Sequence, residues 1–286
     1  MSAAIQVWQI FFRDEQQAWL DPAFVPLDNR GFTDETLEFA VFQRLAASEA
    51  VAPFDYWGAL SWRFGQKTGL TGQTLLDIAV QNPEVDVFYM NPYPEIESVF
   101  QSAWWQGEMV HPGFLAVADA FFTAAGLPVS ELNRLTASHE FSLCNYFVGR
   151  PSFWAAYLPF VAQALAQAEA GMPTAQLARM HSTEADWGLT HNASTYVPFI
   201  VERLFAVFLR TAGRHLTAHQ VRLPPREALM NPALEELRTM KDVAILSRST
   251  RILALWQQKR MDYLRQYPAD WCGEHLNRLI AAPVDW

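Results

Sequence analysis

Two cations, Arg63 and Lys67, stand four residues apart after an apolar run, and this pattern suits a phosphate ligand. The run at residues 56–61 (YWGALS) predicts a buried strand, and Trp62 follows its end. In open α/β sheets ligands bind beyond the carboxyl ends of strands. The two cations could therefore neutralise a diphosphate through charge-assisted hydrogen bonds. The structural alternative pairs Arg63 with an acid such as Asp55 and leaves Trp62 as a packing residue.

Polar side chains also follow the other predicted strands. The residues at these strand ends are Arg13, Asp28, Asn29, Ser61, Asn91 and Asn145. Trp62 or Trp8 could stack on a base, and Asp28 or Asn29 could hold ribose hydroxyls. Together these side chains suit a ligand with a base, a ribose and phosphates.

A carboxylate and a cation interrupt an apolar helical pattern at residues 196–211 (YVPFIVERLFAVFLRT). Charged side chains are rarely buried unless they are paired, so Glu202 and Arg203 are expected to have a functional or structural role. A carboxylate in an apolar cleft can act as a general base, because burial raises its pKa towards working pH. The structural alternative is an internal salt bridge that anchors the helix.

The stretch WWQGEMVH, residues 104–111, mixes flat aromatic rings with hydrogen-bonding side chains. Trp105, Glu108 and His111 together have the character of a sugar-binding surface. The same mixture also occurs in ordinary protein cores, so this stretch alone leaves both interpretations open.

Composition limits the class of protein. The chain has 286 residues, of which 51% are hydrophobic, and carries a formal net charge of −9. Such a chain can bury a large core, and its acidic balance argues against nucleic acid as the main partner. Cys144 and Cys272 have no metal-binding spacing, which favours a reduced, cytoplasmic protein. The apolar run at residues 3–12 is too short for a membrane span and has no basic residues before it.

The elements that position these residues alternate along the chain. Strands are expected at residues 5–12, 56–61, 86–90 and 141–149, with a shorter extended piece before Asp28. Helices are expected at residues 33–47, 71–82, 113–126, 151–171, 196–211 and 231–267. This alternation predicts an α/β fold with a mixed, mostly parallel sheet and helices on both faces. We expect a first domain at residues 1–223 and a helical extension at residues 224–286.

The order of the segments resembles a known family. The sequence reads VWQIFF, YWGALSWRF, DVFYMNPYP, CNYFVGRPSFWAAYLPFV and YVPFIVERLFAVFL, in that order. It is similar to the glycosyltransferases of bacterial capsule and lipopolysaccharide loci. The resemblance covers residues 5–211 and rests more on the order of the motifs than on any one of them. It implies a GT-A-like fold, a nucleotide-sugar donor, and a bacterial surface glycan or lipid-linked glycan as acceptor.

The resemblance implies a role for Glu202, and the residue types and strand ends suggest the other roles. Glu202 stands where an inverting enzyme has its base. The donor would be bound by Gln9, Arg13, Asp28, Asn29, Ser61, Trp62, Arg63 and Lys67. The acceptor sugar would be bound by Asn91, Trp105, Glu108, His111, Asn145 and Arg203.

One departure from the family concerns the metal. Ser61, Trp62 and Arg63 stand where such folds carry an Asp-x-Asp motif, and they cannot chelate Mn²⁺ or Mg²⁺ through paired carboxylates. Either Arg63 and Lys67 replace the metal at the leaving diphosphate, or a metal is held elsewhere, or activity is lost. We favour the first, because positive side chains can stabilise a phosphate leaving group.

The rival interpretation belongs to another class of protein. In it the chain is a non-catalytic glycan-binding or scaffolding protein whose helical tail docks a neighbour or the membrane. The basic residues of the tail leave contact with the inner face of the membrane open, although a solvated helix face explains them equally well.

Overall fold

The protein is built around a six-stranded sheet with the strand order β2-β1-β3-β5-β4-β6. The computed structural model describes residues 3–183, 194–224 and 229–286. Its strands are β1 Ile5–Phe11, β2 Val25–Asp28, β3 Tyr56–Ser61, β4 Val87–Tyr89, β5 Phe147–Gly149 and β6 Ala218–Gln220. Within the sheet β5 is antiparallel to its neighbours β3 and β4, and the other pairs are parallel. The predicted α/β class with a mixed, mostly parallel sheet is confirmed.

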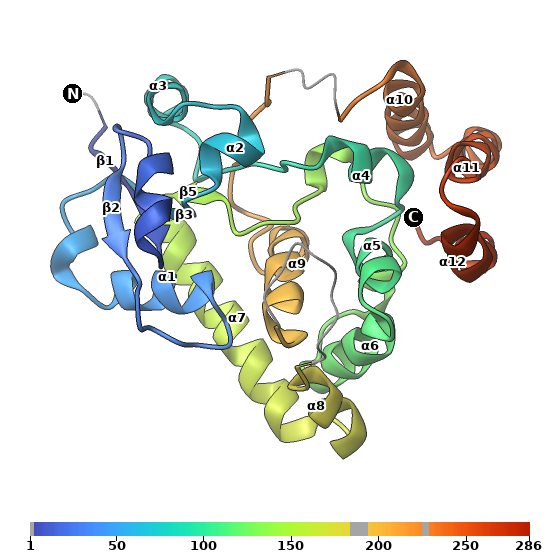
Figure 1. Ribbon diagram of the computed structural model, residues 1–286, viewed down its shortest axis with the longest axis horizontal. Helices are drawn as coiled ribbons and strands as arrows, with labels where there is room; N and C mark the ends of the chain where they lie inside the picture. Colours follow the sequence, from blue (N-terminus) through green and yellow to red (C-terminus); the bar gives the residue numbers. More distant parts are fainter. Residues whose placement is uncertain (1–2, 184–193, 225–228) are drawn as a thin grey trace.

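Helices surround the sheet and continue to the end of the chain (Figure 1). In the first half of the chain they are α1 Glu38–Ala46, α2 Phe64–Thr68, α3 Gly72–Gln81, α4 Pro94–Val99, α5 Ala103–Val110 and α6 Phe114–Ala124. In the second half they are α7 Pro151–Gly171, α8 Thr174–Met180, α9 Val197–Arg210, α10 Pro232–Ser247, α11 Thr250–Leu264 and α12 Ala269–Ala281. Within the described residues, none of these helices is both long enough and apolar enough to cross a bilayer.

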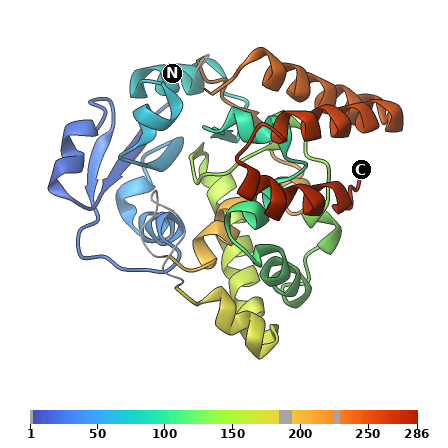
Figure 2. The ribbon, with the colours of Figure 1, turned by 45° about the vertical axis from the view of Figure 1, so that its right-hand side comes forward.

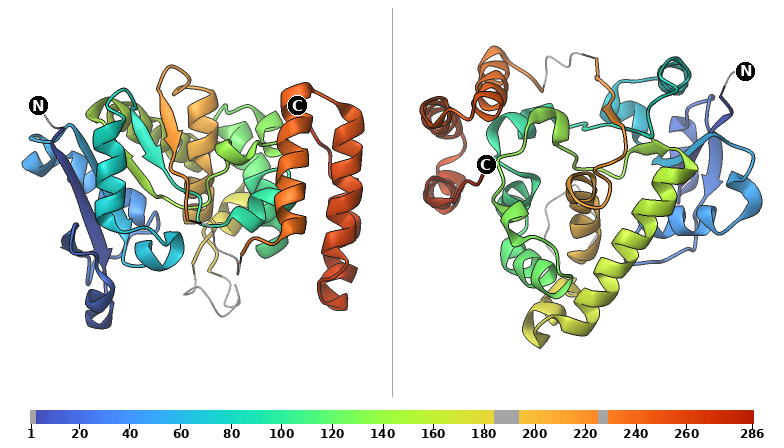
Figure 3. Two further views of the ribbon diagram at one scale, coloured as in Figure 1. Left: turned by 90° about the horizontal axis from the view of Figure 1, so that it is seen from above. Right: turned by 180° about the vertical axis from the view of Figure 1, so that it is seen from behind.

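The two faces of the sheet are covered by different helices. Because side chains alternate along a strand, Val7 of β1 enters one apolar cluster and Trp8 enters another. The Trp8 face packs against α1, α7 and α9, and the Val7 face packs against α2 and α3. Seen from behind, α7 runs diagonally across the molecule (Figure 3). The sheet is thus buried on both faces and offers its strand ends to a ligand.

Local signals explain where several helices begin. The Thr71 side chain accepts a hydrogen bond from the backbone of Thr74 and caps α3, and α7 begins at Pro151, as the sequence predicts. The segment at residues 231–267 is helical, as expected, and consists of two helices, α10 and α11. It is divided at Arg248, whose φ of 49° ends α10, and Ser249 then caps α11. The strand expected at residues 141–149 is reduced to β5, its last three residues.

The C-terminal helices share a core with helices from the middle of the chain. Leu237 of α10 and Trp256 of α11 are buried in one apolar cluster with Phe100 and with Trp105 of α5. The helices α10 and α11 lie antiparallel and side by side (Figure 3), and α12 closes the group beside α5 (Figure 2). The helices α10, α11 and α12 therefore form a layer that packs against α4 and α5.

Candidate functional site

A cavity of about 720 Å³ lies at the carboxyl ends of the central strands. Because β1, β2, β3 and β4 point the same way, the residues that follow them meet at one edge of the sheet. The predicted site residues that line this cavity are Arg13, Asn29, Ser61, Trp62, Arg63, Lys67, His111, Glu202 and Arg203. Gln9, Asp28, Asn91, Trp105, Glu108 and Asn145 do not line it.

Cations from two strand ends form one wall of the cavity. Arg13 follows β1, and Arg63 follows β3 at the start of the short helix α2. Lys67 stands one turn further along α2, on the same face as Arg63, because residues four apart in a helix are neighbours. Asp55, the acid considered as a structural partner for Arg63, accepts a hydrogen bond from the backbone of Ala4 at the opposite end of β3. That pairing is therefore wrong.

The ammonium group of Lys67 lies in a pocket of thiol and phenol groups. Its Nζ is 3.7 Å from Sγ of Cys144, and it lies 5.6 Å and 5.7 Å from the ring centres of Tyr146 and Tyr93. Burial works to lower the pKa of Lys67, but Cys144, Tyr146, Tyr93 and Glu202 outweigh it and raise that pKa. Burial also raises the pKa of Cys144 to about 12. At neutral pH the site therefore holds a charged lysine and a neutral thiol.

Two carboxylates, Glu202 of α9 and Glu38 of α1, also line the cavity. Burial, together with the negative charge of Glu38, raises the pKa of Glu202 to about 7, although Arg203 and Lys67 act in the opposite direction. Leu37, which precedes α1, has φ 50° and ψ −116°. This conformation is costly for a residue with a side chain, and it sets the direction in which α1 starts. The cavity thus contains a base that titrates near neutral pH.

The guanidinium of Arg203 is bound by hydrogen bonds within the protein. Its Nε donates to the carbonyl of Ala103 at 2.8 Å, Nη1 donates to the carbonyl of Phe199 at 2.8 Å, and Nη2 donates to Oε1 of Gln106 at 2.5 Å. Burial lowers its pKa to about 10. Arg203 holds α9 against α5, which fixes the position of the neighbouring Glu202.

Three predicted site residues have structural partners away from the cavity. The amide of Gln9 is buried and accepts a hydrogen bond from the backbone of Asp21 at 2.6 Å. The carboxylate of Asp28 is bound by Arg30 on the surface. The amide of Asn91 donates to Glu97 at 2.7 Å in the interior. None of the three lines the cavity, and each side chain has a partner within the chain.

The proposed sugar-binding stretch also faces the core. The indole of Trp105 donates to Asn133 at 3.0 Å within the cluster that covers the C-terminal helices. Glu108 accepts from the backbone of Leu115 at 2.7 Å and pairs with Arg278 of α12. Asn145 is buried, and its side chain has no hydrogen-bond partner within the described part of the chain. Of Trp105, Glu108, His111 and Asn145, only His111 lines the cavity, with its ring 4.2 Å from that of Phe199.

Some residues of the site were not predicted from the sequence. Tyr93 follows β4, and the rule that placed Arg63 at a strand end would also have found it. Glu38 lies in the first turn of α1, where an acidic residue is common for reasons of helix stability. Cys144 precedes β5, and only the antiparallel direction of that strand brings its amino end to the cavity.

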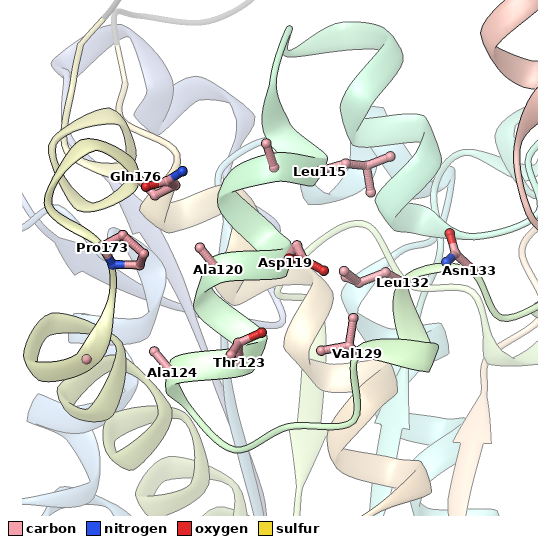
Figure 4. A pocket seen from close by; sticks show the side chains of 12 residues that line it. Leu115, Asp119, Ala120, Thr123, Ala124, Val129, Leu132, Asn133, Pro173 and Gln176 are labelled. Atoms are coloured by element: carbon pink, nitrogen blue, oxygen red, sulfur yellow. The ribbon is translucent and has the colours of Figure 1, made fainter.

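A second hollow of about 630 Å³ lies between α6 and α8 (Figure 4). Small side chains line most of it, including Ala120, Ala124 and Pro173, and Asp119 is the one charged residue among those that line it. It is remote from the strand ends and gathers no group of acids, bases or cations. The candidate site is therefore the cavity at the sheet edge.

Comparison with known proteins does not assign the chain to a family. No protein-family model, no curated protein sequence and no solved structure matches it.

Proposed function

We propose that the protein is an inverting glycosyltransferase that moves a sugar from a nucleotide-sugar donor to a bacterial surface glycan. One observation carries the proposal: the same cavity is lined by Arg63 and Lys67 at a strand end and by Glu202, whose pKa is raised to about 7. Cations that bind a diphosphate and a base near neutral pH are the two groups that such a transfer needs. The GT-A-like identity of the fold belongs to this proposal.

The donor would occupy the sheet side of the cavity. Arg63 and Lys67 would hold the diphosphate, and Arg13 would approach it from the end of β1. The half-buried indole of Trp62 would stack on the base. The amide of Asn29, held by Arg44 at 2.5 Å, would face the ribose.

The proposed transfer is a single displacement. An acceptor hydroxyl oxygen attacks the anomeric carbon and gives its proton to the carboxylate of Glu202. The bond between that carbon and the diphosphate oxygen breaks, and its electron pair leaves with the nucleoside diphosphate. Arg63 and Lys67 stabilise the charge that grows on the leaving oxygen.

A divalent cation does not fit the end of β3. Ser61, Trp62 and Arg63 offer a hydroxyl, an indole and a guanidinium there, and the hydroxyl of Ser61 is shared with that of Tyr146 at 2.7 Å. Protein sites for Mn²⁺ and Mg²⁺ usually supply one or two carboxylates, and these three residues supply none. In the proposed step, Arg63 and Lys67 therefore stabilise the leaving diphosphate in place of a metal ion.

Nucleotide binding and turnover test the proposal separately. Thermal unfolding is measured with UDP, GDP, CDP and TDP, each with and without Mn²⁺, and at least one should raise the midpoint. The matching nucleotide sugar should be hydrolysed slowly in the presence of a chelator. Glu202→Gln should abolish hydrolysis, whereas Glu236→Gln, on the exposed surface of α10, should leave it unchanged.

The results separate the enzyme from its rival. If none of the nucleotides shifts the midpoint, the proposal fails. If a nucleotide binds but Glu202→Gln still turns over, the base has been assigned wrongly. Nucleotide binding without turnover of any nucleotide sugar would favour the non-catalytic, scaffolding protein.

A further inference from the structure

The loop at residues 29–37, between β2 and α1, forms part of the cavity wall. Asn29 at its start and Leu37 at its end both line the cavity, and so does Glu38, the first residue of α1. Residues 30–35 are all exposed, and segments with little apolar burial open easily. Polar contacts must therefore hold the 29–37 loop in place, and with it this wall of the cavity.

The end of the loop is tied to the helices through a single side chain. Glu35 lies 2.8 Å from Nδ1 of His181, at the end of α8. Among the residues that the structure describes, the other hydrogen bonds of residues 33–36 join close neighbours in the sequence. The start of the loop has ties of its own, to Asp14 and Arg44. The position of the second half of the loop therefore depends on His181.

His181 binds two carboxylates at once. Its Nε2 lies 2.6 Å from Glu169 of α7, while Nδ1 binds Glu35. These are the charged groups of the described chain that act on the ring, one from the loop and one from α7. An ionised carboxylate only accepts hydrogen bonds, so both ring nitrogens must carry a proton, as they do in the charged imidazole. The neutral ring has one N–H, so the loss of a proton breaks one of the two bonds.

The bond to the loop is the one that should break. Glu169 belongs to α7, a helix of 21 residues whose other face lies in the apolar core. Glu35 belongs to an exposed segment that loses no burial when it moves. Two residues later, Leu37 has φ 50° and ψ −116°, a strained conformation that movement of the loop would relieve. Deprotonation of the ring should therefore free the loop and keep the bond to α7.

We propose that His181 is a pH-sensitive latch on the cavity wall: the charged ring holds the 29–37 loop against α7 and α8, and the neutral ring releases it. The wall at Leu37 is then fixed at low pH and mobile at high pH. Because both carboxylates favour the charged ring, the change occurs above the ordinary histidine pKa of about 6.5. The latch is independent of what the cavity binds.

NMR on the full chain tests the latch without a ligand. Leucine methyl groups and histidine rings are labelled with ¹³C, and spectra are recorded from pH 5 to 9. The Glu202→Gln chain is used, because Glu202 also titrates in the cavity with a pKa of about 7. The order parameter of the Leu37 methyl should fall with the same midpoint as the titration of the His181 ring. The methyl of Leu246, exposed on α10, should show no such change.

A second substitution separates the latch from the titration itself. In Glu35→Gln the ring of His181 should still titrate, at lower pH because one carboxylate is gone. The mobility of Leu37 should no longer depend on pH, since an amide can pair with either form of the ring. Glu49→Gln, on the exposed surface beyond α1, is the matched control and should keep the pH dependence. Unchanged methyl signals from the buried Leu204 would show that both variants keep the fold.

The outcomes decide the matter in either direction. A Leu37 order parameter that stays constant while His181 titrates overturns the latch, and so does a pH-dependent change that persists in Glu35→Gln. A change that follows His181 and disappears in Glu35→Gln supports it. No nucleotide enters these measurements, so the transferase proposal stands or fails separately.

Discussion

The Nζ atom of Lys67 lies 3.7 Å from the Sγ atom of Cys144, which joins α2 to the segment before β5. The two residues are 77 positions apart, and the antiparallel direction of β5 brings them together. Since burial raises the pKa of Cys144 to about 12, the thiol stays neutral and does not cancel the lysine charge. The ammonium group is thus held at the cavity with its charge intact.

Replacing this lysine should weaken nucleotide binding. Lys67→Met keeps the length of the side chain and removes the charge, so the Kd for the preferred nucleoside diphosphate should rise about 10- to 100-fold. Isothermal titration calorimetry measures the change. Lys259→Met, on the exposed surface of α11, is the control and should bind as the wild type does. An unchanged Kd in Lys67→Met would remove the lysine from the site.

The activity should depend on pH through Glu202. Its pKa is raised to about 7, so the rate should fall about tenfold per pH unit below that value, where the base is protonated. Glu38→Gln removes a neighbouring negative charge, which should move the midpoint to lower pH. Initial rates from pH 5 to 9 test this expectation, with Glu236→Gln as the control. A midpoint that stays in place or rises in Glu38→Gln would contradict it.

The residues at the carboxyl ends of the parallel strands could be predicted from the sequence. β1 and β3 are rich in aromatic and aliphatic residues, and sequence alone identifies them and the residues at their ends. Parallel strands bring those ends to one edge of the sheet, so Arg13, Asn29 and Arg63 line a common cavity. Glu202 could also be predicted, because a carboxylate inside an apolar helix needs a reason to be there.

Asn145, Trp105 and Glu108 were predicted to bind the ligand but do not line the cavity, because the same residue pattern is compatible with a binding surface and with a core. Cys144 and Tyr146 face Lys67, and alternation in the extended chain turns Asn145 away from it. Trp105 and Glu108 have the composition of a sugar-binding surface, but their partners Asn133 and Arg278 lie far away in sequence. Only the packing of the C-terminal layer decides between a binding surface and a core.

A buried lysine should be important for stability at the junction of the two layers. Lys241 of α10 is fully buried, and its ammonium donates to the carbonyl of Glu97 and, at 3.3 Å, to that of Phe100. Burial lowers the pKa of Lys241 and raises the pKa of Glu97. Lys241→Ala should lower the free energy of unfolding by about 3–5 kcal/mol, because it removes the donor to two buried carbonyls and one of the two cations, Lys241 and Arg238, that lie beside Glu97.

Urea unfolding at pH 7 measures this loss. Lys259→Ala is the matched control, since Lys259 pairs with Glu236 on the exposed surface and its removal should cost less than about 1 kcal/mol. Equal effects of the two variants would show that the buried lysine does not stabilise the junction.

His181 should make the free energy of unfolding depend on pH. His181, at the end of α8, has Nδ1 2.8 Å from Glu35 and Nε2 2.6 Å from Glu169 of α7. Burial works to lower its pKa, but the hydrogen bonds and charges of the two carboxylates outweigh it and raise that pKa. The charged ring therefore joins α7, α8 and the segment before α1.

The direction of the pH effect follows from this raised pKa. The stabilisation is complete below the unfolded pKa of about 6.5 and is lost as the pH rises through the higher folded value. His181→Ala should lower the free energy of unfolding by about 1 kcal/mol at pH 6, because the pair is partly exposed, and by much less at pH 9. Urea unfolding at both pH values measures the difference. The exposed His139→Ala should give the same small change at each pH, and a constant loss in His181→Ala would mean that the ring acts by packing alone.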